Sequence, residues 1–213
     1  MVRTPIVKEG YIYIAVLGLV TFLTALALGT HWALIPGVLT AFVTFFFRNP
    51  GRDVPANDTL VVSPADGKVM GVAEVYDDQF LNDKGIKVTI FLSVFDVHVN
   101  RSPVQGEIKF QQYTCGRFKP AYKESASCEN ERHAIGLEND KMRVLVTQIA
   151  GILARRIVSW VTLGTILKQG ERYGLIKFGS CTELIVPETV EILVKKGDRV
   201  KGGKTVIGRL KEE

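Results

Sequence analysis

The feature that most constrains the fold is a long stretch without charge near the N-terminus. Residues 10–47 contain no Asp, Glu, Lys or Arg. Two nearly pure apolar runs, 11–29 and 33–47, lie within this stretch. A helix needs about 20 apolar residues to span a bilayer, so the first run is long enough and the second is short. The stretch predicts a hydrophobic helical hairpin that anchors the chain in a membrane.

Basic residues lie on both sides of the predicted hairpin. Arg3 and Lys8 precede it, and Arg48 and Arg52 follow it. Positive charge near the ends of membrane segments marks the cytoplasmic side, so both ends are expected there, with Trp32 at the far interface. Arg48 and Arg52 would then hold the rest of the chain against anionic lipid headgroups. A shallow hairpin that enters only one leaflet fits the same pattern.

A secretory signal is the main alternative for this segment. Residues 25–27 read Ala-Leu-Ala, which resembles a cleavage site. Glu9 interrupts the basic leader, however, and a second apolar run directly after the cleavage point would be unusual in a mature secreted protein. These two features favour a membrane anchor.

The charge and the cysteines restrict the remaining classes. Lys and Arg number 27 against 22 Asp and Glu, a formal net charge of +5. Such a chain could bind nucleic acid or an anionic lipid surface, and the apolar segment favours lipid. The three cysteines, Cys115, Cys128 and Cys181, have no CxxC spacing, so they indicate neither a disulfide framework nor a zinc site. They fit a reducing compartment.

The chain after Pro50 has the pattern of a β protein. Short runs of Val, Ile, Leu and Phe alternate with Gly, Pro, Asn and Asp. The expected strands are 60–63, 68–75, 86–94, 107–113, 143–149, 153–161, 175–178, 182–186 and 190–194. The polar stretch 119–132 is expected to form a loop or a short exposed helix.

A weak internal repeat adds information about the architecture. Five residues recur in the same order: Val161, Gly164, Leu167, Lys168 and Gly170 match Val194, Gly197, Val200, Lys201 and Gly203. The pattern describes two strands joined by a glycine turn, as in lipoyl and biotinyl carrier domains. No Lys has the setting of a carrier lysine. The predicted fold is therefore mainly β, a sandwich or barrel-like hybrid domain with lipoyl-like turns, preceded by the helical hairpin.

Four short segments contain the residue types that carry chemistry. They are Ser63-Pro64-Ala65-Asp66-Gly67, Asp96-Val97-His98-Val99-Asn100-Arg101-Ser102-Pro103, Asn130-Glu131-Arg132 and Lys177-Phe178-Gly179-Ser180-Cys181. Each alone has an ordinary structural explanation; an Asp-Gly pair, for example, is common in hairpin turns. Their occurrence together, in this order and behind an apolar segment, is much more specific.

In this combination the segments resemble the phosphatidylserine decarboxylase family, in its short form of an anchor and a catalytic domain. The resemblance runs from about residue 47 to the C-terminus and is most specific over 172–180. It implies a membrane-anchoring hairpin at 1–48 and a pyruvoyl-dependent decarboxylase domain at 49–213. It also implies self-cleavage into 1–179 (the β chain) and 180–213 (the α chain).

The implied activity converts phosphatidylserine to phosphatidylethanolamine and CO₂. Decarboxylation of an amino acid leaves a carbanion that needs an electron sink. The resemblance implies that Ser180 attacks the Gly179 carbonyl and that the cut chain keeps a pyruvoyl group made from Ser180. The substrate amine forms a Schiff base with this group, and neither pyridoxal phosphate nor a metal is expected.

The resemblance assigns roles to two more residues. Serine is a weak nucleophile at neutral pH and needs a base, which needs an orienting group in turn. His98 matches the family's base and Asp66 its orienting carboxylate. His31 lies in the predicted anchor and His133 directly follows Asn130-Glu131-Arg132 of the polar stretch, so His98 is the preferred base for Ser180.

The chain departs from the family pattern at two positions. Longer members often carry another His where this chain has Phe95, so His98 is expected to serve cleavage and proton return, and the proton donor stays open. Cys181 stands where relatives commonly have Thr, Ser or Arg. Its thiol could instead attack the Ser180 carbonyl, but that reaction would leave no pyruvoyl group.

The basic residues of the matched segments are candidates for the substrate phosphate. Arg and Lys suit phosphate oxygens, and a solvated basic face is the alternative. The candidates are Arg132, Arg155, Arg156 and Lys177. The expected partners are phosphatidylserine in the cell membrane and the second cleaved chain, with the catalytic domain on the cytoplasmic side. Nucleic acid is not expected, and a homo-oligomer stays open.

Three other functions remain open from the residues alone. An archaeal relative that acts on archaetidylserine would use the same chemistry and a nearly identical headgroup site. A membrane-anchored lipoyl-like β-domain without catalysis would stay in one piece. An ordinary secreted β protein would lose about 27 N-terminal residues, as expected for a signal peptide.

Overall fold

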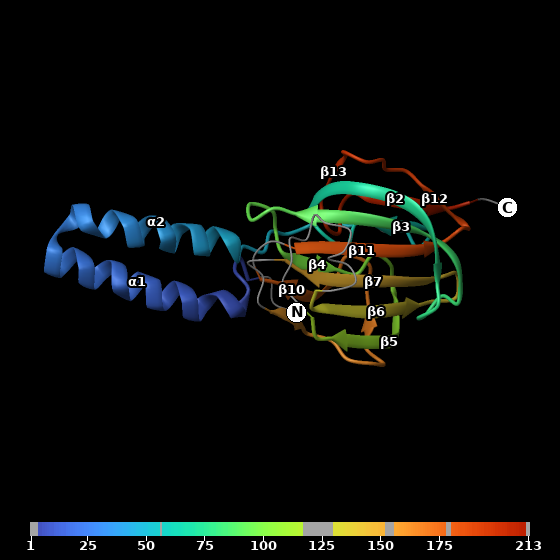
Figure 1. The fold of residues 1–213 in the computed structure, drawn as a ribbon, viewed down its shortest axis with the longest axis horizontal. Helices are drawn as coiled ribbons and strands as arrows, with labels where there is room; N and C mark the ends of the chain where they lie inside the picture. The colour runs from blue at the N-terminus through green and yellow to red at the C-terminus, as the bar shows by residue number, and fades with distance from the viewer. Residues whose placement is uncertain (1–3, 56, 117–129, 152–155, 178–179, 212–213) are drawn as a thin grey trace. The chain divides into compact units, whose positions relative to one another are not determined.

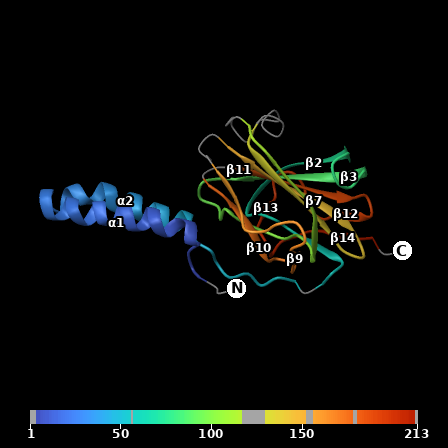
Figure 2. The same cartoon turned by 90° about the horizontal axis from the view of Figure 1, so that it is seen from below.

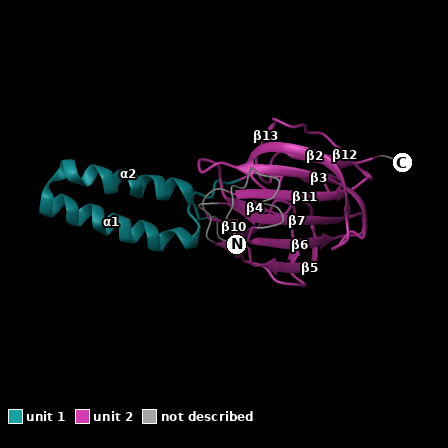
Figure 3. Ribbon diagram, in the orientation of Figure 1, with its two compact units in different colours: residues 1–51 teal, residues 52–213 magenta. Residues whose placement is uncertain are grey.

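The chain divides into two compact units in a computed structural model. They comprise Met1–Gly51 and Arg52–Glu213 (Figure 3). The described residues are 4–55, 57–116, 130–151, 156–177 and 180–211. The units separate close to the boundary predicted after residue 48, and a functional division at that point stays a prediction.

The first unit is a pair of apolar helices, as predicted. Helix α1 (Lys8–Leu28) and helix α2 (Thr30–Phe46) are joined at Gly29, whose φ of 91° lies in the region that favours glycine (Figure 1). In α1 only Gly10 is buried. Among the described residues, α1 is the one helix long and apolar enough to cross a membrane, and α2 is shorter.

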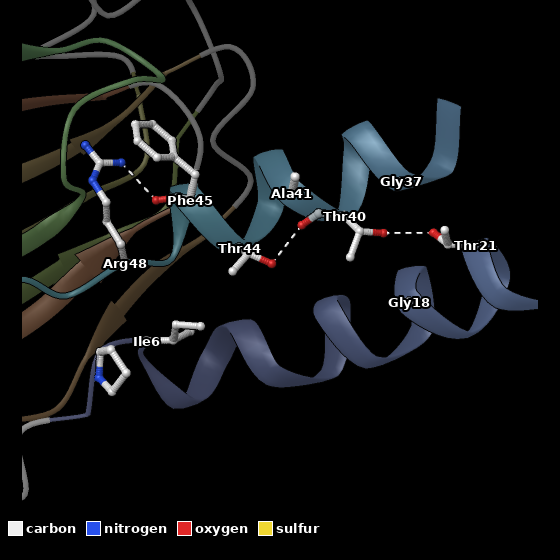
Figure 4. A pocket seen from close by; sticks show the side chains of 10 residues that line it. Ile6, Gly18, Thr21, Gly37, Thr40, Ala41, Thr44, Phe45 and Arg48 are labelled. Atoms are coloured by element: carbon white, nitrogen blue, oxygen red, sulfur yellow. Dashed lines mark hydrogen bonds between the residues drawn. The ribbon is translucent and has the colours of Figure 1, made fainter. Parts of the chain in front are cut away.

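Polar contacts join the two helices of the hairpin. The hydroxyls of Thr21 and Thr40 lie 3.1 Å apart, and Val7 N–H donates to Phe47 C=O at 3.0 Å. Between the helices lies a hollow of about 730 Å³ (Figure 4). Its lining consists mainly of small and apolar residues: Pro5, Ile6, Gly18, Thr21, Gly37, Thr40, Ala41, Thr44, Phe45 and Arg48.

The second unit is built on one large antiparallel sheet and two small ones (Figures 1 and 2). The large sheet has the order β13 (Arg199–Val200), β2 (Gly67–Asp77), β3 (Asp83–Leu92), β11 (Ser180–Pro187), β7 (Arg143–Ala150), β6 (Arg132–Glu138), β5 (Gly106–Thr114) and β9 (Ile166–Leu167). One small sheet has the order β1 (Leu60–Val62), β14 (Val206–Leu210) and β12 (Val190–Ile192). The other has the order β4 (Val99–Arg101), β10 (Arg172–Ile176) and β8 (Ile157–Ser159).

The main core of this unit contains residues from all three sheets. Val61 and Ile207 from the first small sheet and Tyr173 from the second belong to the same buried cluster as Ile90 and Val146 of the large sheet. The large sheet is curled, and buried side chains alternate with half-buried ones from Thr182 to the end of β11, whereas β6 and β7 contain runs of consecutive buried residues. The prediction of a mainly β fold behind a helix pair is confirmed.

The predicted glycine repeat is present in the structure. Its glycines all have positive φ: Gly164 at 81°, Gly170 at 73°, Gly197 at 103° and Gly203 at 71°. The two copies contain β9 and β13, which lie at opposite edges of the large sheet.

A second repeat escaped the sequence reasoning. Residues 63–67 (SPADG) and 102–106 (SPVQG) form the same turn, in which the serine hydroxyl donates at 2.7 Å to the carbonyl two residues later. The serine carbonyls of the two turns accept an N–H at 2.8 Å from Gly203 and Gly170, respectively. The two turns lead into β2 and β5, which are each the second strand from opposite edges of the large sheet.

Most of the predicted strands are present, with changed ends. The prediction was wrong for Arg132, which was expected in a loop and begins strand β6. Strands β4, β6, β9, β13 and β14 were not predicted, because they are short or carry few β-branched residues. The remainder of the polar stretch up to residue 129, and residues 153–155 of another predicted strand, lie outside the described residues.

Candidate active site

Ser180 is the first residue of β11, at the centre of the large sheet. It pairs with Leu92 of β3 on one side and with Ala150 of β7 on the other. Its side chain is fully buried, and its hydroxyl has no hydrogen-bond partner among the described residues. A buried polar group without a partner costs about 1–3 kcal/mol, so such groups need an explanation. Gly179, the predicted site of attack, lies outside the described residues.

His98 lies directly before β4 and is fully buried. Its Nδ1 atom lies 2.9 Å from the carbonyl oxygen of Asp96. Because a carbonyl can only accept, Nδ1 carries the proton in the neutral ring and Nε2 keeps its lone pair. A ring with the proton on Nδ1 and a lone pair on Nε2 is the tautomer that a general base requires. The backbone carbonyl of His98 accepts from Ile176 N–H at 3.2 Å, at the end of the strand that leads to Ser180.

The turn before His98 is held by the side chain of Asp96. Its Oδ2 atom accepts from the N–H and the hydroxyl of Ser93 at 2.9 and 2.8 Å. Its Oδ1 atom accepts from Arg199 Nη1 at 3.0 Å. Sequence reasoning gave Asp96 no role, although it lies two residues before His98 in the same matched segment. A hollow of about 410 Å³ adjoins this turn, with Lys68 in its lining.

Asp66 is held by a buried ion pair. Arg52 Nη2 donates to both carboxylate oxygens, at 2.7 and 2.9 Å, and Gly202 N–H donates to Oδ1 at 2.8 Å. The side chains of Arg52 and Asp66 are 9% and 13% exposed. The expectation that Arg52 faces lipid headgroups is therefore wrong, because its guanidinium is buried against this carboxylate. The orienting role of Asp66 toward His98 stays a prediction.

The Asn130-Glu131-Arg132 segment lies beside the strand that pairs with Ser180. Asn130 Nδ2 donates to the Ala150 carbonyl at 2.7 Å, and Ala150 N–H donates to the Glu131 carbonyl at 2.9 Å. The Glu131 carboxylate accepts from Ile157 N–H at 3.2 Å. Residues 130–132 therefore lie one strand beyond β7, the strand whose Ala150 pairs with Ser180.

The structure gathers part of the predicted phosphate-binding set. Lys177 N–H donates to the Arg156 carbonyl at 3.2 Å, so these two residues are adjacent across β10 and β8. Arg132 follows Glu131, whose carboxylate reaches the residue after Arg156. Arg155 lies outside the described residues. A role for any of them in binding phosphate stays a prediction.

Two alternative reacting groups have unsuitable surroundings. Burial raises the pKa of the Cys181 thiol, so its nucleophilic thiolate is disfavoured. Burial also lowers the pKa of His133, and both of its ring nitrogens have partners: Gln148 Oε1 at 3.3 Å and Gln111 Nε2 at 2.9 Å. The preference for His98 over His133 as the base stays a prediction.

Comparison with known proteins gives a consistent family. A model of the phosphatidylserine decarboxylase family matches residues 39–208. The phosphatidylserine decarboxylase proenzyme of Carboxydothermus hydrogenoformans is 52% identical over 213 residues, with 98% of this chain and 99% of the relative covered. The proenzyme of the same name from Symbiobacterium thermophilum is 50% identical, with 98% and 97% covered. The chain belongs to the phosphatidylserine decarboxylase family.

Proposed function

We propose that this protein decarboxylates phosphatidylserine to phosphatidylethanolamine, as part of phospholipid biosynthesis. The observation that carries the proposal is the buried Ser180 hydroxyl, which has no partner among the described residues. Ser180 comes shortly after strand β10, whose Ile176 N–H donates to the His98 carbonyl. Family membership and the proenzyme names of the relatives support a chain that must be processed before it acts. Archaetidylserine would fit the same headgroup chemistry, and the bacterial relatives favour phosphatidylserine.

Maturation begins with proton transfer from the Ser180 hydroxyl to His98 Nε2. The hydroxyl oxygen then bonds to the Gly179 carbonyl carbon, and the peptide C–N bond breaks as the Ser180 nitrogen takes the proton. Loss of the Ser180 α-proton breaks the Cβ–O bond and releases the Gly179 carboxylate. The dehydroalanine that remains takes up water and releases ammonia, which leaves an N-terminal pyruvoyl group before Cys181.

The pyruvoyl carbonyl supplies the electron sink that decarboxylation requires. The protein's own residues position the substrate around it. Arg156 and Lys177, which are adjacent across two strands, are proposed to bind the lipid phosphate, together with Arg132 and Arg155. His98 is proposed to return a proton after CO₂ leaves. We expect no dependence on a metal or on pyridoxal phosphate.

The sheet supports a stable complex of the two cleaved chains. Strand β11, in the C-terminal chain, pairs with β3 from Ser180↔Leu92 to Pro187↔Gly85, and with β7 on its other edge. Strand β14 of the same chain lies between β1 and β12. A cut before Ser180 leaves these ladders intact from Cys181 onward. The apolar helix α1 supports attachment to the cell membrane, and we propose that the catalytic unit lies on the cytoplasmic side.

Intact-mass measurement of the purified protein tests the proposal. We expect two chains, 1–179 and 180–213, the small one lighter by one ammonia than a peptide with an ordinary Ser180. Borohydride with phosphatidylserine should attach the lipid amine to the small chain, and Ser180→Ala should stay uncut. A single uncut chain with normal activity, or activity that depends on pyridoxal phosphate, would refute the proposal. A cut after Ser180 would transfer the reaction to Cys181.

A further inference from the structure

The side chain of Asn100 makes three hydrogen bonds in the interior of the second unit. It is fully buried on β4. Its Nδ2 atom donates to the Thr182 hydroxyl at 3.0 Å and to the Pro64 carbonyl at 3.3 Å. Its Oδ1 atom accepts from Gln148 Nε2 at 2.8 Å. One amide thus joins strands β4, β7 and β11 and the turn that begins at residue 63.

The segments joined by this amide carry the three proposed site residues. Asn100 lies two residues after His98, and Thr182 lies two residues after Ser180 on the same face of its strand. Pro64 lies two residues before Asp66. We propose that Asn100 is a positioning residue that holds the serine, the base and the carboxylate segments in their relative places. This inference rests on the proposed function, because it concerns the same site.

A chain of buried side chains fixes which way the Asn100 amide faces. Gln148 donates to Asn100, so its own Oε1 faces His133, whose Nδ1–H donates to it at 3.3 Å. His133 Nε2 then accepts from Gln111 Nε2 at 2.9 Å. Every donor meets an acceptor only if His133 is neutral with its proton on Nδ1. Burial, which lowers the pKa of His133, favours that neutral ring.

Strand β10 makes room for these amides. Gly174 pairs with Asn100, and a Cβ atom there would lie 3.1 and 3.2 Å from the two amide atoms of Gln148. It would also lie 2.6 Å from the Val158 carbonyl oxygen. Gly174, in the most specific matched stretch, therefore leaves the space that Gln148 occupies when it reaches Asn100.

The amide matters for the reaction because attack on a carbonyl depends steeply on geometry. A shift of about 1 Å in a reacting group can cost about 100-fold in rate. The Ser180 hydroxyl has no partner among the described residues that would restrain it. The hydrogen bonds of Asn100 act two residues away, on the backbone segments that carry the reacting groups. Loss of one of them should slow self-cleavage without changing its chemistry.

Thr182→Val tests the inference with little change of shape. Valine keeps the β-branched form of the side chain and removes the oxygen that Asn100 contacts, whereas Thr182→Ser keeps the oxygen. Thr147→Val makes the same substitution at a half-buried position of β7 as a control. First-order cleavage rates would be measured on freshly translated full-length chain across a pH series. We expect Thr182→Val to fall at least about tenfold, with Thr182→Ser and Thr147→Val within about threefold of the parent.

The pH series and a stability measurement separate positioning from general damage. In Thr182→Val the plateau rate should fall while the midpoint of the pH profile stays, because the base itself is unchanged. In an uncut Ser180→Ala background, Thr182→Val should unfold at a slightly lower urea concentration, because Asn100 loses one buried partner, and should stay fully folded under the conditions of the cleavage assay. Asn100→Ala should show at least the same loss of rate.

Two results would overturn the inference. One is a Thr182→Val chain that cleaves as fast as Thr147→Val, and the other is a loss of rate that only follows unfolding. Failure of the parent chain to cleave would instead refute the proposed function, so the two failures are distinguishable.

Discussion

The ion pair between Arg52 and Asp66 gives a prediction whose magnitude follows from burial. Arg52→Ala removes the guanidinium that contacts both carboxylate oxygens at 2.7 and 2.9 Å and leaves only the Gly202 N–H of the described partners. Both side chains are nearly buried, at 9% and 13% exposed, so water cannot replace the lost charge easily. Removing one partner of a buried pair costs about 3–5 kcal/mol of the free energy of unfolding.

An exposed pair in the same unit provides the matched control. Arg209 and Glu191 lie 3.2 Å apart, with their side chains 50% and 52% exposed. Arg209→Ala should therefore cost less than about 1 kcal/mol. Adding Asp66→Asn to Arg52→Ala should recover part of the loss, because a neutral amide removes the uncompensated charge.

Equilibrium urea unfolding of the uncut Ser180→Ala chain in detergent measures these differences. The chain has two tryptophans, so a Trp32→Phe background leaves Trp160 of the second unit as the fluorescent probe. Equal losses for Arg52→Ala and Arg209→Ala would refute the argument, since they would mean that the Asp66 carboxylate is hydrated. In the chain that keeps Ser180 and can therefore cleave itself, Arg52→Ala should also slow self-cleavage.

Three further outcomes are expected. A chain that begins at Arg52 should still cleave itself, because the reaction is intramolecular. Its turnover of bilayer substrate should fall and recover with short-chain phosphatidylserine in detergent; a folded truncated chain that cannot cleave would place the anchor in the catalytic fold. Cys181→Ala should still be cut before Ser180, and iodoacetamide should modify the exposed Cys115 but not Cys181 in the folded chain, as peptide mapping would show. Because the folded pKa of His133 is lowered, the stability from its neutral ring is complete above about pH 6.5 and declines as the pH falls. His133→Gln should therefore shrink the loss of unfolding free energy between about pH 8 and about pH 5.5, and an unchanged loss would contradict this.

Local patterns were enough for the helices and most of the strands, and they also gave the prediction that Ser180 is the reacting serine. The charge-free stretch predicted the hairpin because an apolar segment of about 20 residues is most stable as a helix in the lipid bilayer. The glycines of the repeat predicted turns because positive φ is a local property of one residue. The choice of Ser180 and His98 rested on short segments whose order along the chain is itself sequence information.

The partners of these residues depended on the tertiary structure. Arg52 resembled a flanking membrane arginine in the sequence, and only the fold brings its guanidinium to Asp66. Strand β6 was missed because its His and Gly residues weaken the strand pattern, although its pairing with β5 and β7 stabilises it. Asn100 meets Thr182 across 82 residues of chain. Such contacts arise where strands pair, and pairing depends on the packing of the whole sheet, which no local pattern records.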